Sequence, residues 1–331
     1  MVKIVRFHQF GDADVLQLEE LPITEPGKGE VRLKVEAIGL NRAEVMFRQG
    51  AYIEEPDSFP STLGYEAAGV IDAVGEGVTE FKIGDRVSTI PGFSMKNYGV
   101  YGESAIAPVA MVAKYPAKLS PQEGTAIWMQ YMTAYGALVE YGKVKSGDFV
   151  LISAASSSVG SAAIQITKAA GATAIATTRG ASKKQMLLDN GADHVIVTND
   201  EDLPNRVMEI TNGQGANIIF DPVAGSYIET LAKAAARGAT IFEYGALSME
   251  NTPFPLFPAL EKGLKVQGYT LFEIAGDPGK LEKAKQYIYD GLESGKLVPI
   301  IDRSFPLEQI VDAHRYMESN QQNGKIIVTV P

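Results

Sequence analysis

A run of small residues in the middle of the chain is suited to bring the backbone close to a phosphate group. Residues 153–160 have the sequence SAASSSVG and follow the apolar run of residues 149–152. A dinucleotide-binding fold has its glycine-rich turn at this point, where the next helix supplies N–H donors to a pyrophosphate. A Ser-rich turn that only caps a helix is the alternative. We predict that this turn contacts a cofactor through Ser156, Ser157, Ser158, Val159 and Gly160.

About twenty residues farther on, the chain carries basic side chains where an NAD site has a carboxylate. Thr178, Arg179 and Lys183 lie in this segment, and the first acidic residue after them is Asp189. Arginine can stack on adenine and bind a 2′-phosphate in bidentate geometry. We therefore predict that these three residues contact the cofactor and that NADPH is preferred over NADH. The alternative is that Arg179 and Lys183 form a solvated surface pair.

From about residue 125, strands and helices alternate in the pattern of a doubly wound parallel sheet. The continuous apolar run at residues 149–152 predicts a buried strand, and further strands are predicted at residues 173–178, 194–197, 217–221 and 239–244. Helices are predicted from residue 159 to Gly171 and at residues 182–190, 203–211 and 227–236. Gly171 stands where a left-handed residue would end the first of these helices.

The earlier part of the chain is richer in short strands with Gly and Pro turns. Val31, Leu33, Val35 and Ala37 alternate with charged residues, as in a half-buried strand. The tail predicts helices at residues 280–294 and 307–319 and a strand at 325–330. We predict an α/β chain in which residues 1–124 and 270–331 form a β-rich domain that residues 125–269 interrupt.

Composition excludes several functions. The 331 residues include no Cys and only three His, so a disulfide, a thiolate zinc site or a cysteine nucleophile is impossible. The net charge of −10 and the lack of a basic run argue against a nucleic-acid partner. No apolar run of about 18 residues is present to span a membrane. We expect a cytoplasmic protein.

Several motifs, taken in order, resemble the medium-chain dehydrogenase/reductase superfamily along the whole chain. They are Gly39-Leu40-Asn41-Arg42-Ala43-Glu44, Gly64-Tyr65-Glu66-Ala67-Ala68-Gly69, Val74-Gly75-Glu76-Gly77-Val78, Gly84-Asp85-Arg86-Val87, Gly191-Ala192-Asp193-His194-Val195-Ile196 and Gly324-Lys325-Ile326-Ile327. This resemblance implies a GroES-like catalytic domain and a Rossmann domain that binds NADPH. It also implies a homodimer, formed by the strand at residues 264–269 across a two-fold axis.

The chain departs from the zinc enzymes of that superfamily. Asn41 stands where they have Cys, and Tyr65 stands where they have His, so that only Glu66 of the catalytic set remains. A tetrahedral zinc site needs three or four N, S or O ligands. We therefore expect no metal. Asn41, Arg48, Gly50 and Tyr52 resemble the active-site stretch of the zinc-independent quinone oxidoreductase (zeta-crystallin-like) branch.

The resemblance suggests two catalytic residues. Asn41 would hold a carbonyl oxygen or the ribose beside the nicotinamide, unless it only bridges groups where the zinc ligand used to be. Tyr52 would supply a proton, unless it only forms an aromatic wall. Glu44 and Glu66 are expected to be internal partners of arginines or of backbone donors, and Tyr65 to fill the vacated space.

Other cofactor contacts follow from the resemblance alone. Thr133 is expected near the nicotinamide. Six further residues lie in segments that resemble family segments near the nicotinamide or its phosphates, and they are expected to contact the cofactor. They are Tyr244, Gly245, Leu271, Phe272, Asn323 and Lys325.

Together these features predict an NADPH-dependent, zinc-independent oxidoreductase. Its substrate would be a small hydrophobic electrophile, a quinone or an activated alkene, which gains hydride while negative charge develops on its oxygen. One alternative is a metal-free reductase of another carbonyl class. The other is a non-catalytic NADPH-binding protein.

Overall fold

The computed structural model describes all residues, Met1–Pro331, and the chain folds into two compact units. The first unit combines Met1–Met129 with Pro299–Pro331, and the second is Gln130–Val298. The second unit therefore interrupts the first, and its boundaries differ from the predicted 125–269, above all at the C-terminal side.

The segment before residue 299 belongs with the second unit because its aromatic residues pack there. The rings of Tyr135 and Tyr287 lie 5.0 Å apart between centroids, and Lys280 Nζ donates to the Tyr141 hydroxyl at 3.1 Å. Tyr287 and Lys280 come from helix α10 (Pro278–Glu293), which also contacts the short helix α9 (Phe272–Ala275). Helix α10 therefore belongs to the second unit, which continues to Val298 rather than ending near residue 269.

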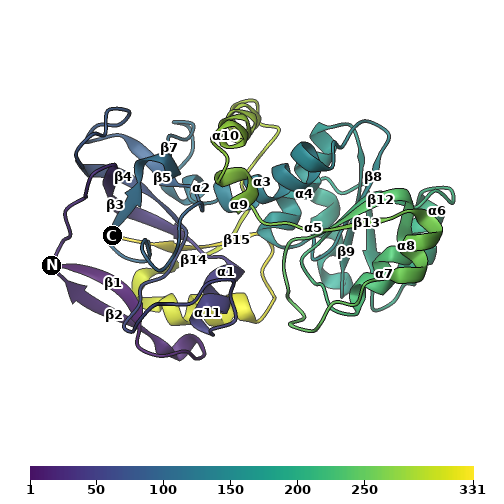
Figure 1. Ribbon diagram of the computed structural model, residues 1–331, viewed down its shortest axis with the longest axis horizontal. Helices are drawn as coiled ribbons and strands as arrows, with labels where there is room; N and C mark the ends of the chain where they lie inside the picture. Colours follow the sequence, from purple (N-terminus) through teal and green to yellow (C-terminus); the bar gives the residue numbers. More distant parts are fainter. The chain divides into compact units, whose positions relative to one another are not determined.

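The first unit is built on strands that pair antiparallel, except for the parallel pair β14 and β15 (Figure 1). They are β1 (Val2–Phe7), β2 (Leu16–Leu21), β3 (Glu30–Gly39), β4 (Glu66–Val74), β5 (Arg86–Thr89), β6 (Ser104–Pro108), β7 (Val112–Ala113), β14 (Ile301–Pro306) and β15 (Lys325–Thr329). A seven-stranded sheet has the order β14-β15-β3-β4-β5-β7, with β6 pairing β3, and β1 pairs with β2 separately. The C-terminal β15 therefore lies directly against the N-terminal β3.

The long strand β3 carries the core of this unit. Val31, Leu33, Val35 and Ala37 are all fully buried, which confirms the alternation predicted from the sequence. Helical segments complete the unit: η1 (Ala13–Val15), α1 (Arg42–Arg48), η2 (Val109–Met111), α2 (Pro121–Gly124), η5 (Leu307–Gln309) and α11 (Ile310–Glu318). Helix α1 follows β3 after two residues, so its first turn lies at the end of that strand.

The second unit contains a six-stranded, wholly parallel sheet with the order β10-β9-β8-β11-β12-β13. The strands are β8 (Phe149–Ile152), β9 (Thr173–Thr178), β10 (His194–Val197), β11 (Ala216–Asp221), β12 (Ala235–Glu243) and β13 (Lys265–Gly268). This is the strand order of a dinucleotide-binding fold, and its switch point lies between β8 and β11. The predicted doubly wound sheet is confirmed.

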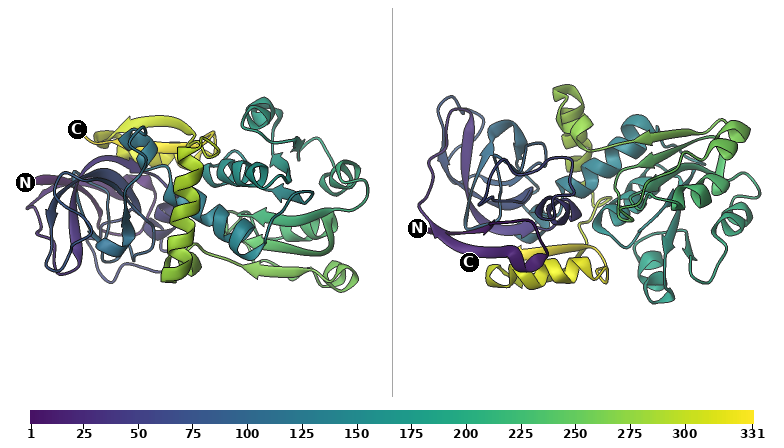
Figure 2. Two further views of the ribbon diagram at one scale, coloured as in Figure 1. Left: turned by 90° about the horizontal axis from the view of Figure 1, so that it is seen from above. Right: turned by 60° about the horizontal axis from the view of Figure 1, so that its bottom comes forward.

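Helices cover both faces of this sheet (Figure 2). They are α4 (Ser158–Ala169), η4 (Ala181–Lys183), α5 (Lys184–Asp189), α6 (Leu203–Ile210), α7 (Tyr227–Ala234) and α8 (Leu256–Lys262). One face of the sheet, with Leu151, Ile175 and Ile219, packs against α6 and α7. Helix α4 contacts β8 and β9, and α5 contacts β10. Helix α3 (Trp128–Tyr135) and the π-helical η3 (Gly136–Tyr141) precede the sheet.

The helix after the Ser-rich turn has the predicted limits. Ser157 is the N-cap of α4, and its hydroxyl accepts the Gly160 N–H at 3.0 Å. Gly171 follows the helix with φ of +73°, the left-handed conformation expected of it. A Cβ on Gly160 would lie 2.6 Å from the Ala155 backbone, so only glycine permits this close packing of turn and helix.

The sequence did not predict β14 or α8. None of the helices combines the length and apolar character needed to span a bilayer.

Candidate functional site

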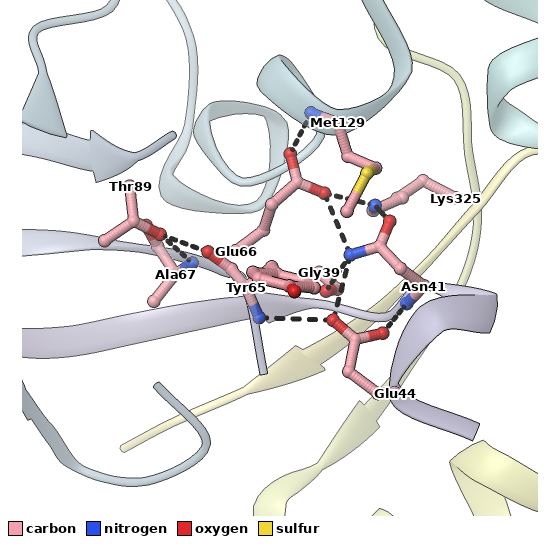
Figure 3. Close-up of polar contacts among 9 residues, drawn as sticks. All are labelled: Gly39, Asn41, Glu44, Tyr65, Glu66, Ala67, Thr89, Met129 and Lys325. Carbon is pink, nitrogen blue, oxygen red and sulfur yellow. Dashed lines mark hydrogen bonds and ion pairs between the residues drawn. The ribbon is translucent and has the colours of Figure 1, made fainter. Parts of the chain in front are cut away.

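A buried polar network in the first unit surrounds the position where the zinc enzymes carry Cys (Figure 3). Asn41, the N-cap of α1, accepts a hydrogen bond at its Oδ1 from Lys325 Nζ at 2.6 Å. Its Nδ2 donates to Glu44 Oε1 at 3.1 Å, to Gly39 O at 3.2 Å and to Glu66 Oε2 at 3.3 Å. The amide of Asn41 is therefore fully engaged within the unit, which favours the bridging interpretation of this residue.

Lys325 and Glu66 form a buried ion pair at the centre of this network. The Lys325 ammonium donates to Glu66 Oε2, and both side chains are 1% exposed or less. The other carboxylate oxygen, Oε1, accepts the Met129 N–H at 2.8 Å. Lys325 was predicted to contact the cofactor. In the structure its ammonium is bonded to Asn41 and Glu66, and the cofactor role remains a prediction.

Glu44 is the second buried carboxylate. Its Oε2 accepts the Asn41 backbone N–H at 2.5 Å and its Oε1 accepts the Tyr65 N–H at 3.2 Å. Burial raises the pKa of Glu44 to about 7, although the nearby Lys325 charge opposes that shift. The expectation of backbone donors for both carboxylates is thus correct.

The arginines that were the alternative partners of these carboxylates, Arg42 and Arg48, are bonded elsewhere. Arg42 donates instead to Met317 O at 2.8 Å and Asn320 Oδ1 at 2.7 Å, and Arg48 pairs with Glu318. Both arginines lie on α1 but are bonded to the α11 region, which local sequence could not reveal.

Tyr52 lies in a second cluster of the first unit, beside Tyr65. The two hydroxyl oxygens are 3.4 Å apart, and the Tyr65 hydroxyl is 3.3 Å from Glu54 Oε1. Burial raises the pKa of Tyr52 to about 12, and it raises the pKa of Tyr65 as well. Both phenols are therefore protonated donors at neutral pH. Tyr65 fills space, as expected, but its hydroxyl also has polar partners.

In the second unit, the predicted cofactor segments meet at one edge of the sheet. The turn 153–160 follows β8, Thr178 and Arg179 stand at the end of β9, Tyr244 and Gly245 follow β12, and Leu271 and Phe272 follow β13. Because all these strands are parallel, their carboxyl ends lie at the same edge, where such folds bind ligands. Thr133 lies within the second unit, on α3.

The basic segment at residues 178–183 contacts the Ser-rich turn at residues 153–160. Lys183 Nζ donates to Ser156 Oγ at 3.2 Å across 27 residues of sequence. Thr178 is buried, whereas Arg179 is exposed. This arrangement suits a dinucleotide: small residues and N–H groups for the pyrophosphate, with cationic groups beside them.

Asn323, unlike the cofactor segments just described, lies in the first unit. It lies just before β15 in the first unit, and its Oδ1 is buried without a hydrogen-bond partner. Its predicted cofactor contact, like that of Lys325, would come from the first unit.

Sequence reasoning missed two carboxylates, Asp221 and Glu243, at the ends of β11 and β12. Asp221 Oδ2 accepts the Ala224 N–H at 2.7 Å and the Val223 N–H at 3.1 Å, so it shapes the turn after β11. Burial and the neighbouring Asp221 charge raise the pKa of Glu243 to about 9. The signal was present in the sequence, because an acidic residue ends each of two neighbouring buried strands.

The residues of the first unit do not fit a zinc ion. The described chain contains no group of three or more His, Cys, Asp or Glu side chains placed to hold a metal. Glu66 is the one member of the zinc-ligand set that this chain retains. Its Oε2 is paired with the Lys325 ammonium, whose positive charge would oppose a metal cation at the same oxygen.

Two family models match the chain. Residues 27–117 match the alcohol dehydrogenase GroES-like domain, and residues 158–287 match a domain described as zinc-binding dehydrogenase. The two matches fall on the two units.

Whole-length relatives agree with these matches. The human quinone oxidoreductase is 32% identical and covers 99% of this chain and 98% of its own length. A 2-haloacrylate reductase from Burkholderia sp is 28% identical, with 99% of both chains covered. The crystal structure of Escherichia coli quinone oxidoreductase complexed with NADPH superposes with a TM-score of 0.91 at 29% identity, covering 99% of both chains.

The buried ion pair generates a stability prediction. Lys325→Met should lower the free energy of unfolding by about 3–5 kcal/mol, because it leaves the Glu66 carboxylate buried without a cation. Lys3→Met, which breaks the exposed and solvent-screened pair with Glu308, should lower the free energy of unfolding far less. Urea denaturation would measure both. Adding Glu66→Gln to Lys325→Met should restore part of the loss, and equal losses for the two lysine variants would contradict the account.

Proposed function

This chain belongs to the quinone oxidoreductase branch of the medium-chain dehydrogenase/reductase superfamily, and we propose that it is a zinc-independent reductase of quinones or α,β-unsaturated carbonyls. The observation that carries the metal-free chemistry is the Lys325 ammonium bonded to both Asn41 and Glu66. The positions of Asn41 and Glu66 belong to the zinc-ligand set of the alcohol dehydrogenases of the superfamily, so alcohol oxidation on zinc is disfavoured.

Bound NADPH supplies the hydride, and the residues of the second unit hold and orient it. We propose that the backbone of residues 156–160 receives the pyrophosphate at the N-terminus of α4. Arg179, with Thr178 and Lys183 beside it, binds the 2′-phosphate. Lys183 is already tied to Ser156, which supports a continuous phosphate-binding edge.

Tyr52 is the proposed hydrogen-bond donor to the acceptor. As hydride reaches the electrophilic carbon, negative charge develops on the acceptor oxygen, and a phenol hydroxyl stabilises that charge and then protonates it. The raised pKa of Tyr52 keeps its proton in place at neutral pH. We propose that Asn41 organises Lys325 and Glu66, because its amide hydrogens are engaged inside the unit.

The substrate class is supported by the relatives. One is a quinone oxidoreductase and another is a 2-haloacrylate reductase. A quinone and a 2-haloacrylate each contain an electron-poor C=C bond conjugated to a carbonyl or carboxylate group. A polarised C=C or C=O system of this kind accepts hydride without a metal, provided that a donor meets its oxygen.

We further propose a homodimer through the edge strand β13. This strand ends the sheet and lacks a second neighbour. Helix α8 and the residues before it expose large apolar side chains, with Phe257 80% and Leu260 72% exposed. A second copy would cover both the open edge and these side chains.

The activity prediction concerns the acceptor. With NADPH, we expect oxidation by a para-quinone, an ortho-quinone, an enone or a 2-alkenal, unaffected by a chelator, and none by simple aldehydes. Loss of absorbance at the NADPH band is the measurement. Turnover of simple aldehydes alone would instead favour a reductase of another carbonyl class. Tight NADPH binding without any turnover would favour a non-catalytic protein.

Arg179 should decide the choice of cofactor. Arg179→Ala should raise KM for NADPH about 10- to 100-fold, the range of a lost hydrogen bond to a charged group, and change KM for NADH little. Steady-state kinetics with each cofactor would measure this. Lys233→Ala, on the exposed side of α7, is the control and should affect neither cofactor. Equal effects of Arg179→Ala on both cofactors would refute the assignment.

The dimer proposal predicts a change of mass. Light scattering at micromolar concentration should give a dimer for the native chain and a monomer for Phe257→Asp, because a buried charge at the contact is costly. Glu261→Gln, an exposed change on the same helix, should stay dimeric. A native monomer would contradict the proposal.

A further inference from the structure

Tyr65 occupies a rigid position in the first unit. Its backbone N–H donates to Glu44 Oε1 at 3.2 Å, and its carbonyl accepts the Thr89 hydroxyl at 2.8 Å. Its ring, which is fully buried, lies 5.7 Å from the Phe93 ring and 6.4 Å from the Tyr52 ring between centroids. The backbone and the ring packing together fix where the hydroxyl oxygen lies.

That hydroxyl has two acceptors within reach and a single proton to donate. Tyr52 Oη is 3.4 Å away and Glu54 Oε1 is 3.3 Å away. A phenol donates one hydrogen bond at a time, so rotation about the C–O bond selects the partner. The nearly equal distances mean that neither choice requires the ring to move.

Glu54 does not depend on Tyr65. Its Oε2 accepts the Ser94 hydroxyl at 2.5 Å, and its Oε1 also accepts the Met95 N–H at 2.9 Å. The carboxylate therefore keeps two donors when the Tyr65 hydroxyl turns away. The loss of the longer bond to Tyr65 costs this side chain little.

Tyr52 alone is a reluctant proton donor. Burial raises its pKa to about 12, and the charges of Glu44 and Glu54 act in the same direction, whereas the hydrogen bond from Tyr65 lowers it. A phenolate left in this half-buried position needs a hydrogen-bond donor at its oxygen. The Tyr65 hydroxyl, which donates to the Tyr52 oxygen at 3.4 Å, is such a donor.

We propose that Tyr65 is a positioning residue for Tyr52, whose hydroxyl turns from Glu54 to the Tyr52 oxygen as Tyr52 gives its proton to the acceptor. This inference rests on the proposed function. The Tyr52 O–H bond breaks, and the proton bonds to the acceptor oxygen that became negative when the acceptor carbon received hydride. Tyr65 keeps its own proton and donates a hydrogen bond to the phenolate. Water later returns one proton to Tyr52.

The test is a double-variant cycle with a para-quinone and NADPH. Tyr65→Phe should lower kcat about 10- to 100-fold with little change in KM, the effect of one hydrogen bond formed to a charged oxygen during the reaction. Tyr52→Phe should lower kcat at least as much. The double variant should lose no more than Tyr52→Phe alone, because Tyr65 acts through Tyr52.

A second readout separates this role from a structural one. When proton transfer becomes slower, the solvent deuterium isotope effect on kcat should rise in Tyr65→Phe, whereas a merely misfolded fraction would lower kcat without changing that ratio. Tyr98→Phe is the matched control, because the Tyr98 hydroxyl also donates to a carboxylate, Glu30 Oε1 at 2.7 Å, and the change leaves its ring in place. It should keep the native kcat and isotope effect.

The outcomes distinguish the two proposals. If the native protein turns over and Tyr65→Phe keeps the native kcat, the role of Tyr65 is overturned and the proposed function stands. Additive losses of kcat in the double variant would have the same meaning. No turnover of any acceptor by the native protein would overturn the proposed function and the role of Tyr65 with it.

Discussion

The buried ion pair between Lys325 and Glu66 is the interaction on which the first unit depends. It joins the last strand, β15, to the start of β4, while Asn41 connects it to α1 and Met129 connects it to α3. A buried pair adds little net stability compared with apolar side chains, yet neither partner can be removed alone without leaving an unpaired charge. The pair therefore fixes how segments from both ends of the chain come together.

The same pair shapes the chemistry that we propose. A lysine supplies, within the protein, the positive charge that a metal brings in related enzymes, and it has no open coordination position for a substrate oxygen. Stabilisation of a developing oxyanion then has to come from hydroxyl donors, and Tyr52 is the one proposed. The proposed substrates are for this reason acceptors whose own conjugation spreads the charge, rather than alcohols that need a Lewis acid.

Local patterns predicted the second unit well. The strands predicted at 149–152, 173–178 and 194–197 coincide with β8, β9 and β10. The continuous apolar run at 149–152 is typical of a parallel strand buried on both faces. The candidate site was harder to predict, because the partners of Lys325 lie 284 and 259 residues away. Likewise Tyr65 was expected only to fill space, since its pairing with Tyr52 and Glu54 depends on how the irregular segment between α1 and β4 folds. The boundary near residue 299 depended on ring packing that no local pattern encodes.

The proposed reaction is metal-free hydride transfer from NADPH to a conjugated acceptor. The most direct measurement is the primary deuterium isotope effect on quinone reduction, using NADPH deuterated at the transferred C4 position and protein dialysed against a chelator. We expect full activity after chelation and a lower rate with the deuterated cofactor in single-turnover mixing. Activity that disappears on chelation and returns with zinc would contradict it, as would a quinone that accepts electrons with no isotope effect.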